Sequence, residues 1–140
     1  MRKLLLLATA VALLVAAPAA SAATIRVDTS SDTNANDGLC SLREAVRAAN
    51  TDAPTLGCPA GGGPDTISVP GGTFKLTIDG DDQAAANGDL DITATVTIQG
   101  QGPGVTTVDG NNISRVFEVR PAVTGVRPHQ RIVGFRRGTE

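Results

Sequence analysis

From residue 65 onward the chain is a series of short β-type runs, and no helical pattern separates them. The runs are rich in valine, isoleucine and threonine, with glycine, proline, asparagine or aspartate between them. Because parallel βαβ units need a helical crossover between their strands, this pattern excludes them. Strands are predicted within residues 66–69, 73–78, 90–92, 96–98, 107–108 and 116–119, after a shorter one at 24–27.

These runs fall into two triplets, which indicates a repeat. The first triplet starts at Ile67 and the second at Val96. Each triplet predicts one turn of a coil, whose strands stack on the corresponding strands of the next turn. A β-sandwich built from hairpins is the alternative that the same texture allows. An insertion at residues 79–88 would project from the first turn as an acidic loop.

One helix is predicted over residues 41–50. Ser41 and Glu44 have the spacing of a capping box, in which each side chain binds the other residue's backbone amide. Apolar residues follow at helical spacing: Leu42, Ala45, Val46 and Ala49. A helix this short is stable only when it packs against other elements.

The N-terminus predicts export. Arg2 and Lys3 precede an apolar run at residues 4–15, and small residues at 20–22 provide a cleavage site. This is the pattern of a secretory signal peptide over residues 1–22. The alternative is a membrane anchor, but the run is shorter than the roughly 20 residues that cross a bilayer. No second apolar run follows, so no membrane span is expected in the mature chain.

Export determines how the two cysteines are interpreted. Cys40 and Cys58 form an even set in an oxidising compartment, which predicts a disulfide. Free or intermolecular thiols are the alternative. A metal site would need more ligands, and the only histidine, His129, is distant in sequence.

Composition and charge exclude several binding classes. Hydrophobic residues make up 41% of the chain but aromatic residues only 2%, so the core must be aliphatic. This disfavours a sugar-stacking face, a base-stacking platform and a haem or flavin pocket. Residues 23–113 are acidic, whereas arginines concentrate in residues 115–137. Without interleaved aromatic residues, nucleic acid is not the expected partner of that basic segment.

The helix motif resembles a known family. Cys40, Ser41, Leu42, Arg43, Glu44 and Ala45 are similar to the signature of the CSLREA-domain family, as is the continuation to Asn50. Further similar pieces lie at residues 65–67, 70–74, 88–92, 96–100 and 115–117, so the resemblance covers residues 24–120.

The resemblance implies the N-terminal turns of an exported bacterial right-handed parallel β-helix, a pectate-lyase-like solenoid capped by one short helix. Residues 23–64 would form the cap and residues 65–120 the first turns. Arg43 and Glu44 would be capping and surface partners and not catalysts.

The C-terminal segment departs from this pattern. Residues 121–125 begin a further turn, but residues 126–140 lose the alternation of apolar and polar residues. We therefore expect 121–140 to be a basic, disordered or frame-shifted tail of a truncated product. A genuine short form with a tail that binds anionic wall polymers or nucleic acid is the alternative. The last turn would leave an unpaired strand edge, through which copies could self-associate.

Two acidic segments are candidates for calcium. The first contains Asp32, Asn34 and Asn36, although the glycine and glutamate that follow are each one place later than in an EF-hand. The second is the loop with Asp79, Asp81 and Asp82. Turn formation is the competing explanation for both, and our prediction is that the protein has no cofactor.

The candidate sets of catalytic residues in the sequence give only weak support for an enzyme. Asp89 and Asp91 are two apart and could form a carboxylate pair on one strand face, but aspartates that flank turns are the simpler interpretation. The glycine-rich residues 100–104 lack the ending of a phosphate loop. A non-enzymatic exported cell-surface or extracellular fragment is therefore predicted, with adhesion or display implied for longer relatives. The alternatives are a remnant of a carbohydrate-active β-helix enzyme (a polysaccharide lyase or hydrolase) and a calcium-binding module.

Overall fold

The computed structural model describes residues 21–113, 115–120, 130–133 and 136–137, which are mostly strands with a single short helix. The predicted signal peptide lies almost wholly outside these residues. The elements are β1 (Thr24–Arg26), α1 (Leu42–Thr51), β2 (Asp65–Ser68), β3 (Gly72–Lys75), β4 (Leu90–Ile92), β5 (Val96–Gln99), β6 (Thr106–Asp109), β7 (Phe117–Val119), β8 (Gln130–Val133) and β9 (Arg136–Arg137).

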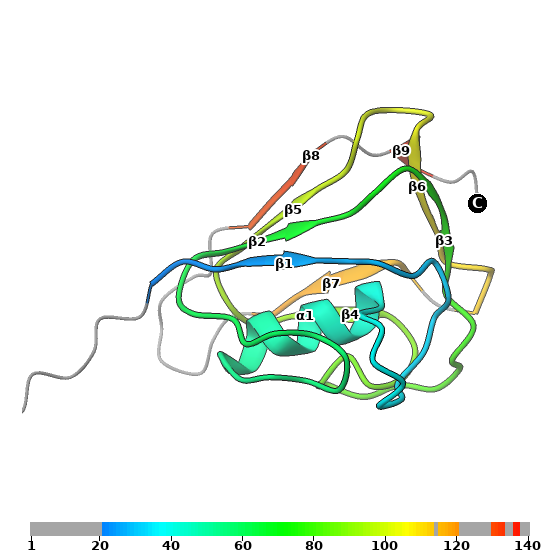
Figure 1. Cartoon of the computed structure of the whole chain (residues 1–140). Helices are drawn as coiled ribbons and strands as arrows, with labels where there is room; N and C mark the ends of the chain where they lie inside the picture. Colours follow the sequence, from blue (N-terminus) through cyan, green and yellow to red (C-terminus); the bar gives the residue numbers. More distant parts are fainter. Residues whose placement is uncertain (1–20, 114, 121–129, 134–135, 138–140) are drawn as a thin grey trace, which may run out of the picture.

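The strands form three sheets, and the chain visits them in turn. Their orders are β1-β2-β5-β8, β3-β6-β9 and β4-β7 (Figure 1), and every pair of these strands is parallel. The predicted stacking of the two triplets is confirmed, because β2, β3 and β4 pair with β5, β6 and β7 respectively. The hairpin sandwich is wrong for the described strands, since hairpins would give antiparallel pairs.

The register of the stack differs from the expected repeat. Ile67 pairs with Ile98, whereas Val96 pairs with Asp65. A shift of two residues keeps every side chain on the same face, so alternation alone cannot detect it. The pairing also aligns Ile25 with Ile67 and Ile132 with Ile98. Isoleucines therefore occupy matching positions in β1, β2, β5 and β8, and they identify the observed register.

The core is aliphatic, as the composition requires. In β2 and β5 buried positions alternate with more exposed ones, which places Ile67 and Ile98 inside the coil at 0% exposure. Phe74 is the only buried aromatic side chain among the described residues. Ile113, Val116 and Phe117 pack against the core but remain partly exposed.

Helix α1 begins at the predicted capping box. The Ser41 hydroxyl accepts a hydrogen bond from the Glu44 amide at 3.2 Å, and the Glu44 carboxylate accepts one from the Ser41 amide at 3.0 Å. The helix ends where Asp52 adopts a left-handed conformation. It lies across the start of the coil, in contact with β1, β2 and β4 (Figure 1).

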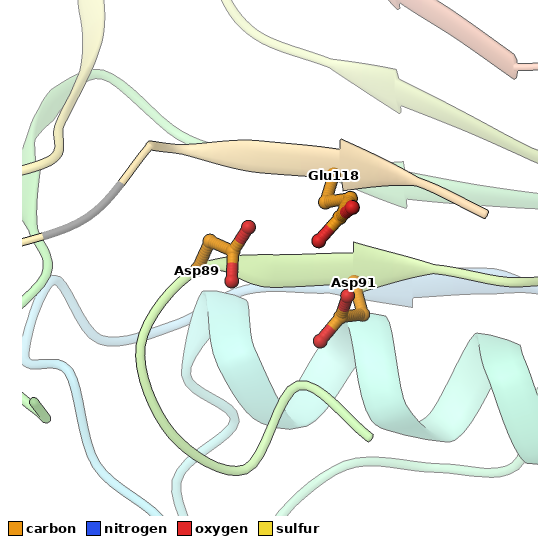
Figure 2. Close-up of side chains that lie close together, drawn as sticks. All are labelled: Asp89, Asp91 and Glu118. Carbon is orange, nitrogen blue, oxygen red and sulfur yellow. The ribbon is translucent and has the colours of Figure 1, made fainter. Parts of the chain in front are cut away.

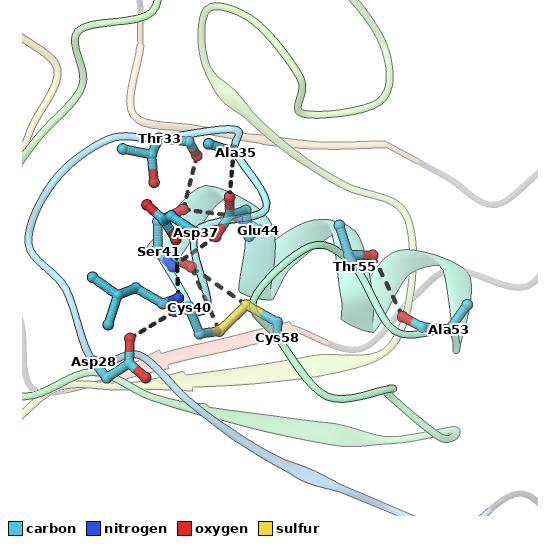
Figure 3. The surroundings of a disulfide bond; sticks show 11 residues. Asp28, Thr33, Ala35, Asp37, Cys40, Ser41, Glu44, Ala53, Thr55 and Cys58 are labelled. Atoms are coloured by element: carbon cyan, nitrogen blue, oxygen red, sulfur yellow. Dashed lines mark hydrogen bonds between the residues drawn. A yellow bond between two sulfur atoms is a disulfide. The ribbon is translucent and has the colours of Figure 1, made fainter.

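A disulfide fixes the start of this helix. Cys40 and Cys58 are bonded with their Cα atoms 4.6 Å apart, and both residues are buried (Figure 3). Cys40 immediately precedes the N-cap residue, and Cys58 closes the loop that follows the helix. The bond therefore ties the first turn of α1 to the loop beyond its end.

Residues 79–88 are exposed over much of their length, but Ala85 is fully buried and the Gly88 amide donates to the Ile78 carbonyl at 3.0 Å, so the end of the insertion packs onto the protein. The expectation that Arg43 and Glu44 are surface residues is wrong, since both are 0% exposed. The insertion folds against α1 and covers Arg43, whose guanidinium supplies donors to the loop carbonyls.

The C-terminal segment also corrects an expectation. Residues 121–129 lie outside the described part, but residues 130–133 and 136–137 do not abandon the strand pattern. There β8 pairs with β5 and β9 with β6, which adds a fourth strand to one sheet and a third strand to another. The Ile132–Ile98 register explains how a segment dense in arginine still matches the stack. Within the described ranges, no helix is long and apolar enough to cross a membrane.

Candidate functional site

A buried guanidinium joins α1 to the loop before β4. Arg43 donates to both carboxylate oxygens of Asp32, at 2.7 and 3.1 Å, and the two side chains are 0% and 3% exposed. It also donates to the carbonyls of Gly88, at 2.8 Å, and Ala85, at 3.2 Å. A buried charge is stable only when it is paired and hydrogen-bonded, and Arg43 meets both conditions.

Asp32 anchors this network and is not free to hold a metal. Its Oδ2 atom also accepts from the amides of Thr77 and Ile78, at 2.7 and 3.0 Å. Burial raises the pKa of Asp32, but the hydrogen bond from Arg43 and the two amides outweigh it, so the pKa lies below its ordinary 3.8. Asn34 is bound to Arg47 through its side-chain oxygen. The side-chain oxygens of Asp32 and Asn34, two members of the first predicted calcium set, therefore accept hydrogen bonds from protein groups.

The second calcium candidate is engaged within its own loop. Asp82 accepts hydrogen bonds from the amides of Ala84 and Ala86 and from the Asn87 side chain. Slight burial raises the pKa of Asp82, but these bonds lower it below its ordinary value. Asp79 binds the Gly80 amide at 2.8 Å. These contacts are those of turn formation, and the loop forms no metal-sized carboxylate cluster within the described chain.

The amide of Asn50 seals the free edge of β4. Its nitrogen donates to the Asp91 carbonyl at 2.7 Å, and its oxygen accepts from the Thr93 amide at 2.9 Å. These are the two kinds of bond that a neighbouring strand would make. A side chain on α1 therefore occupies the place of a preceding strand.

Three carboxylates converge on the β4–β7 pair. Asp89 precedes β4, Asp91 is its central residue, and Glu118 is directly paired with Asp91 across the sheet. Each contributes an oxygen that lies within 4.8 Å of the others, and Figure 2 shows the three side chains gathered beside the two strands. The two aspartates are 1% and 0% exposed, and Glu118 is partly exposed. Asp89 and Asp91 thus share a face as predicted, but Asp91 does not flank a turn.

Two arginines hold this acidic triad, which we define as Asp89, Asp91 and Glu118. Arg115 donates to Asp89 at 2.6 Å and to Glu118 at 2.8 Å. Arg120 donates to Asp91 at 2.6 Å and to the same Glu118 oxygen at 2.9 Å. Hydrogen bonds to the two aspartates are the main reason that both arginine pKa values are raised, and the charge of Glu118 raises them further. Three negative and two positive groups leave one net negative charge.

The sequence-based reasoning missed Glu118, Arg115 and Arg120. Glu118 belongs to the site only because β7 pairs with β4 in this register. A signal was present, since Leu90-Asp-Ile92 and Phe117-Glu-Val119 both place an acid between two apolar residues. Aligning the third strands of the two turns would have found it.

A pocket of about 230 Å³ lies between α1 and the insertion. Its lining is formed by Arg47, Asn50, Thr51, Thr55, Gln83, Ala84 and Thr93. It contains none of the triad carboxylates, so it does not join them into a catalytic cleft. His129 lies outside the described residues.

Comparisons with known proteins add no identification. A scan against protein-family models and searches of curated proteins and solved structures found no match to this chain.

Proposed function

We propose that this chain is the cap and first turns of a right-handed parallel β-helix in an exported cell-surface or extracellular protein that is not an enzyme. The observation that carries the proposal is the difference between the two ends of the coil. One end is covered by α1, whereas the other presents strand edges that are unpaired within the described residues.

The covered end supports a cap. Asn50 satisfies the edge of β4, and Arg43 satisfies the carbonyls of the preceding loop. Exposed strand edges recruit other strands, and natural sheets cover them with helices or loops. A solenoid also needs a terminal unit that differs from its repeats. The similarity of residues 40–50 to the CSLREA signature agrees with this role.

The opposite end supports extension. In the described chain β7 pairs only with β4, and Val119, the last residue of β7, is 50% exposed. Phe117 and Val116 are only partly covered. Further turns of a longer shaft would complete this surface, and a second copy could associate through it. Adhesion or display would then be a property of the shaft.

Export is supported by the disulfide together with the signal-peptide pattern at residues 1–22. Structural disulfides persist in oxidising compartments. The test is expression of the whole chain in a bacterial host, followed by fractionation and mass spectrometry of the N-terminus. We expect the chain outside the cytoplasm, cleaved near Ala22 and with Cys40 bonded to Cys58. An uncleaved, reduced chain in the cytoplasm would contradict export.

A carbohydrate-active enzyme is the competing function, favoured only by the Asp89–Asp91 pair. Glycoside hydrolases need two placed carboxylates, one of which must donate a proton. Here a guanidinium hydrogen-bonds each aspartate, where a substrate would have to approach. Incubation with pectin-like and other acidic glycans tests this alternative. Release of unsaturated or reducing sugars that is lost in Asp89→Asn would overturn the non-enzyme proposal.

A further inference from the structure

We propose that the acidic triad of Asp89, Asp91 and Glu118 is a calcium site on the flank of the coil. This site differs from both acidic segments singled out in the sequence; its geometry is independent of the proposed function, and its expected affinity rests on the proposed export.

The first argument is an unpartnered oxygen. Asp91 is 0% exposed, and its Oδ1 atom accepts from Arg120, but its Oδ2 atom has no hydrogen-bond partner among the described residues. A buried polar atom without a partner costs about 1–3 kcal/mol, and more when it is charged. Native proteins satisfy such atoms with protein groups, water or an ion, so this oxygen is open to a ligand that carries positive charge.

The second argument is the balance of charge and mobility. The triad keeps one net negative charge after both arginines are counted. Asp89, which precedes β4, and Asp91 within it are buried, whereas the side chains of Arg115 and Arg120 are 61% and 29% exposed. A buried carboxylate is costly to leave unpaired, so an incoming cation would have to replace these guanidinium groups as its counter-charge. The carboxylates would then remain fixed around an incoming cation.

The donor set selects calcium. All three ligands are carboxylates, and no cysteine or histidine joins them, which disfavours zinc. Calcium accepts six to eight oxygens in irregular geometry, whereas magnesium demands a near-ideal octahedron. Three carboxylates on two strands provide a partial shell that water would complete. Extracellular sites of this kind bind with dissociation constants of about 0.1–1 mM.

The test is isothermal titration of the whole, disulfide-bonded chain with calcium chloride. We expect one site of about 0.1–1 mM, and at least a roughly tenfold loss of affinity in Asp91→Asn and in Glu118→Gln. Asp81→Asn is the matched control, because it removes an exposed carboxylate outside the triad. Should Asp91→Asn fail to fold, the partly exposed Glu118 provides the decisive variant.

A further variant separates a cation site from an ion-pair network. Arg120→Gln removes a competitor for the triad, so calcium should bind more tightly than to the wild type. Absence of binding by the wild type at several millimolar calcium would overturn the proposal. So would equal binding of magnesium, or calcium affinity unchanged by both triad variants. The arginines would then be the only counter-charges of the triad.

Discussion

The side chain of Asn50 makes the cap testable with one substitution. Asn50→Ala removes the donor to the Asp91 carbonyl and the acceptor of the Thr93 amide. A hydrogen bond contributes about 1 kcal/mol net, and a buried group left without a partner costs about 1–3 kcal/mol. Asp91 is fully buried, while Thr93 and Asn50 are partly exposed. Loss of the bond from the partly exposed Thr93 amide should cost about 1 kcal/mol, and loss of the bond to the carbonyl of the buried Asp91 about 1–3 kcal/mol. The total loss is then about 2–4 kcal/mol.

The assay is urea denaturation followed by far-ultraviolet circular dichroism. Asn36→Ala is the control, because Asn36 is exposed, and it should change the free energy of unfolding by less than about 0.5 kcal/mol. Asn50→Asp keeps the acceptor for Thr93 but cannot donate to Asp91, so it should also be destabilised. If Asn50→Ala unfolds at the same urea concentration as Asn36→Ala, water replaces the Asn50 side-chain amide with no loss in the free energy of unfolding. The reasoning that α1 stands in for a strand would then be refuted.

Three further changes probe the rest of the cap. Replacing Cys40 and Cys58 by serine should lower the free energy of unfolding by roughly 3 kcal/mol, measured in urea against the disulfide-bonded wild type. Ser41→Ala should cost about 1 kcal/mol through loss of the helix cap, and an unchanged midpoint would contradict the capping role. Asp32→Asn leaves the buried charge of Arg43 unpaired and should cost about 3–5 kcal/mol. Because the pKa of Asp32 is lowered in the fold, its contribution is present above about pH 3.8 and lost as the pH falls through the folded-state pKa. An acid titration of stability should therefore show this loss in the wild type but not in Asp32→Asn.

Local chemistry made the helix predictable. The capping box and the apolar stripe are encoded within ten residues, and both are present in the structure. The partners of Arg43 were not predictable in the same way. Asp32 and Gly88 lie 11 and 45 positions away, and nothing in the local sequence indicates that the insertion covers the guanidinium. Burial of a charge is decided by such long-range contacts.

The strand order was predictable because three short apolar runs recur in the same sequence order, although the loops between them differ in length. The acidic triad was missed because it depends on the register between β4 and β7, which alternation alone leaves open by two residues; only an alignment of the two acid-centred strands would have given it. The last strands were missed for another reason. Arginines mask the alternation at residues 130–137, whereas the backbone pairing needs only a compatible register, such as that of Ile132 with Ile98.

The contacts of α1 also set an order of assembly. The helix is near the start of the chain, but Gly88 and Asp91, which it binds, follow Arg43 and Asn50 by 45 and 41 positions. A chain that emerges from its N-terminus therefore makes the helix well before the strand that needs it. During this interval a helix of ten residues is marginal by itself, and the Cys40–Cys58 bond can already form. The disulfide can thus constrain α1 and the loop that follows it before β4 is available to pack against the helix.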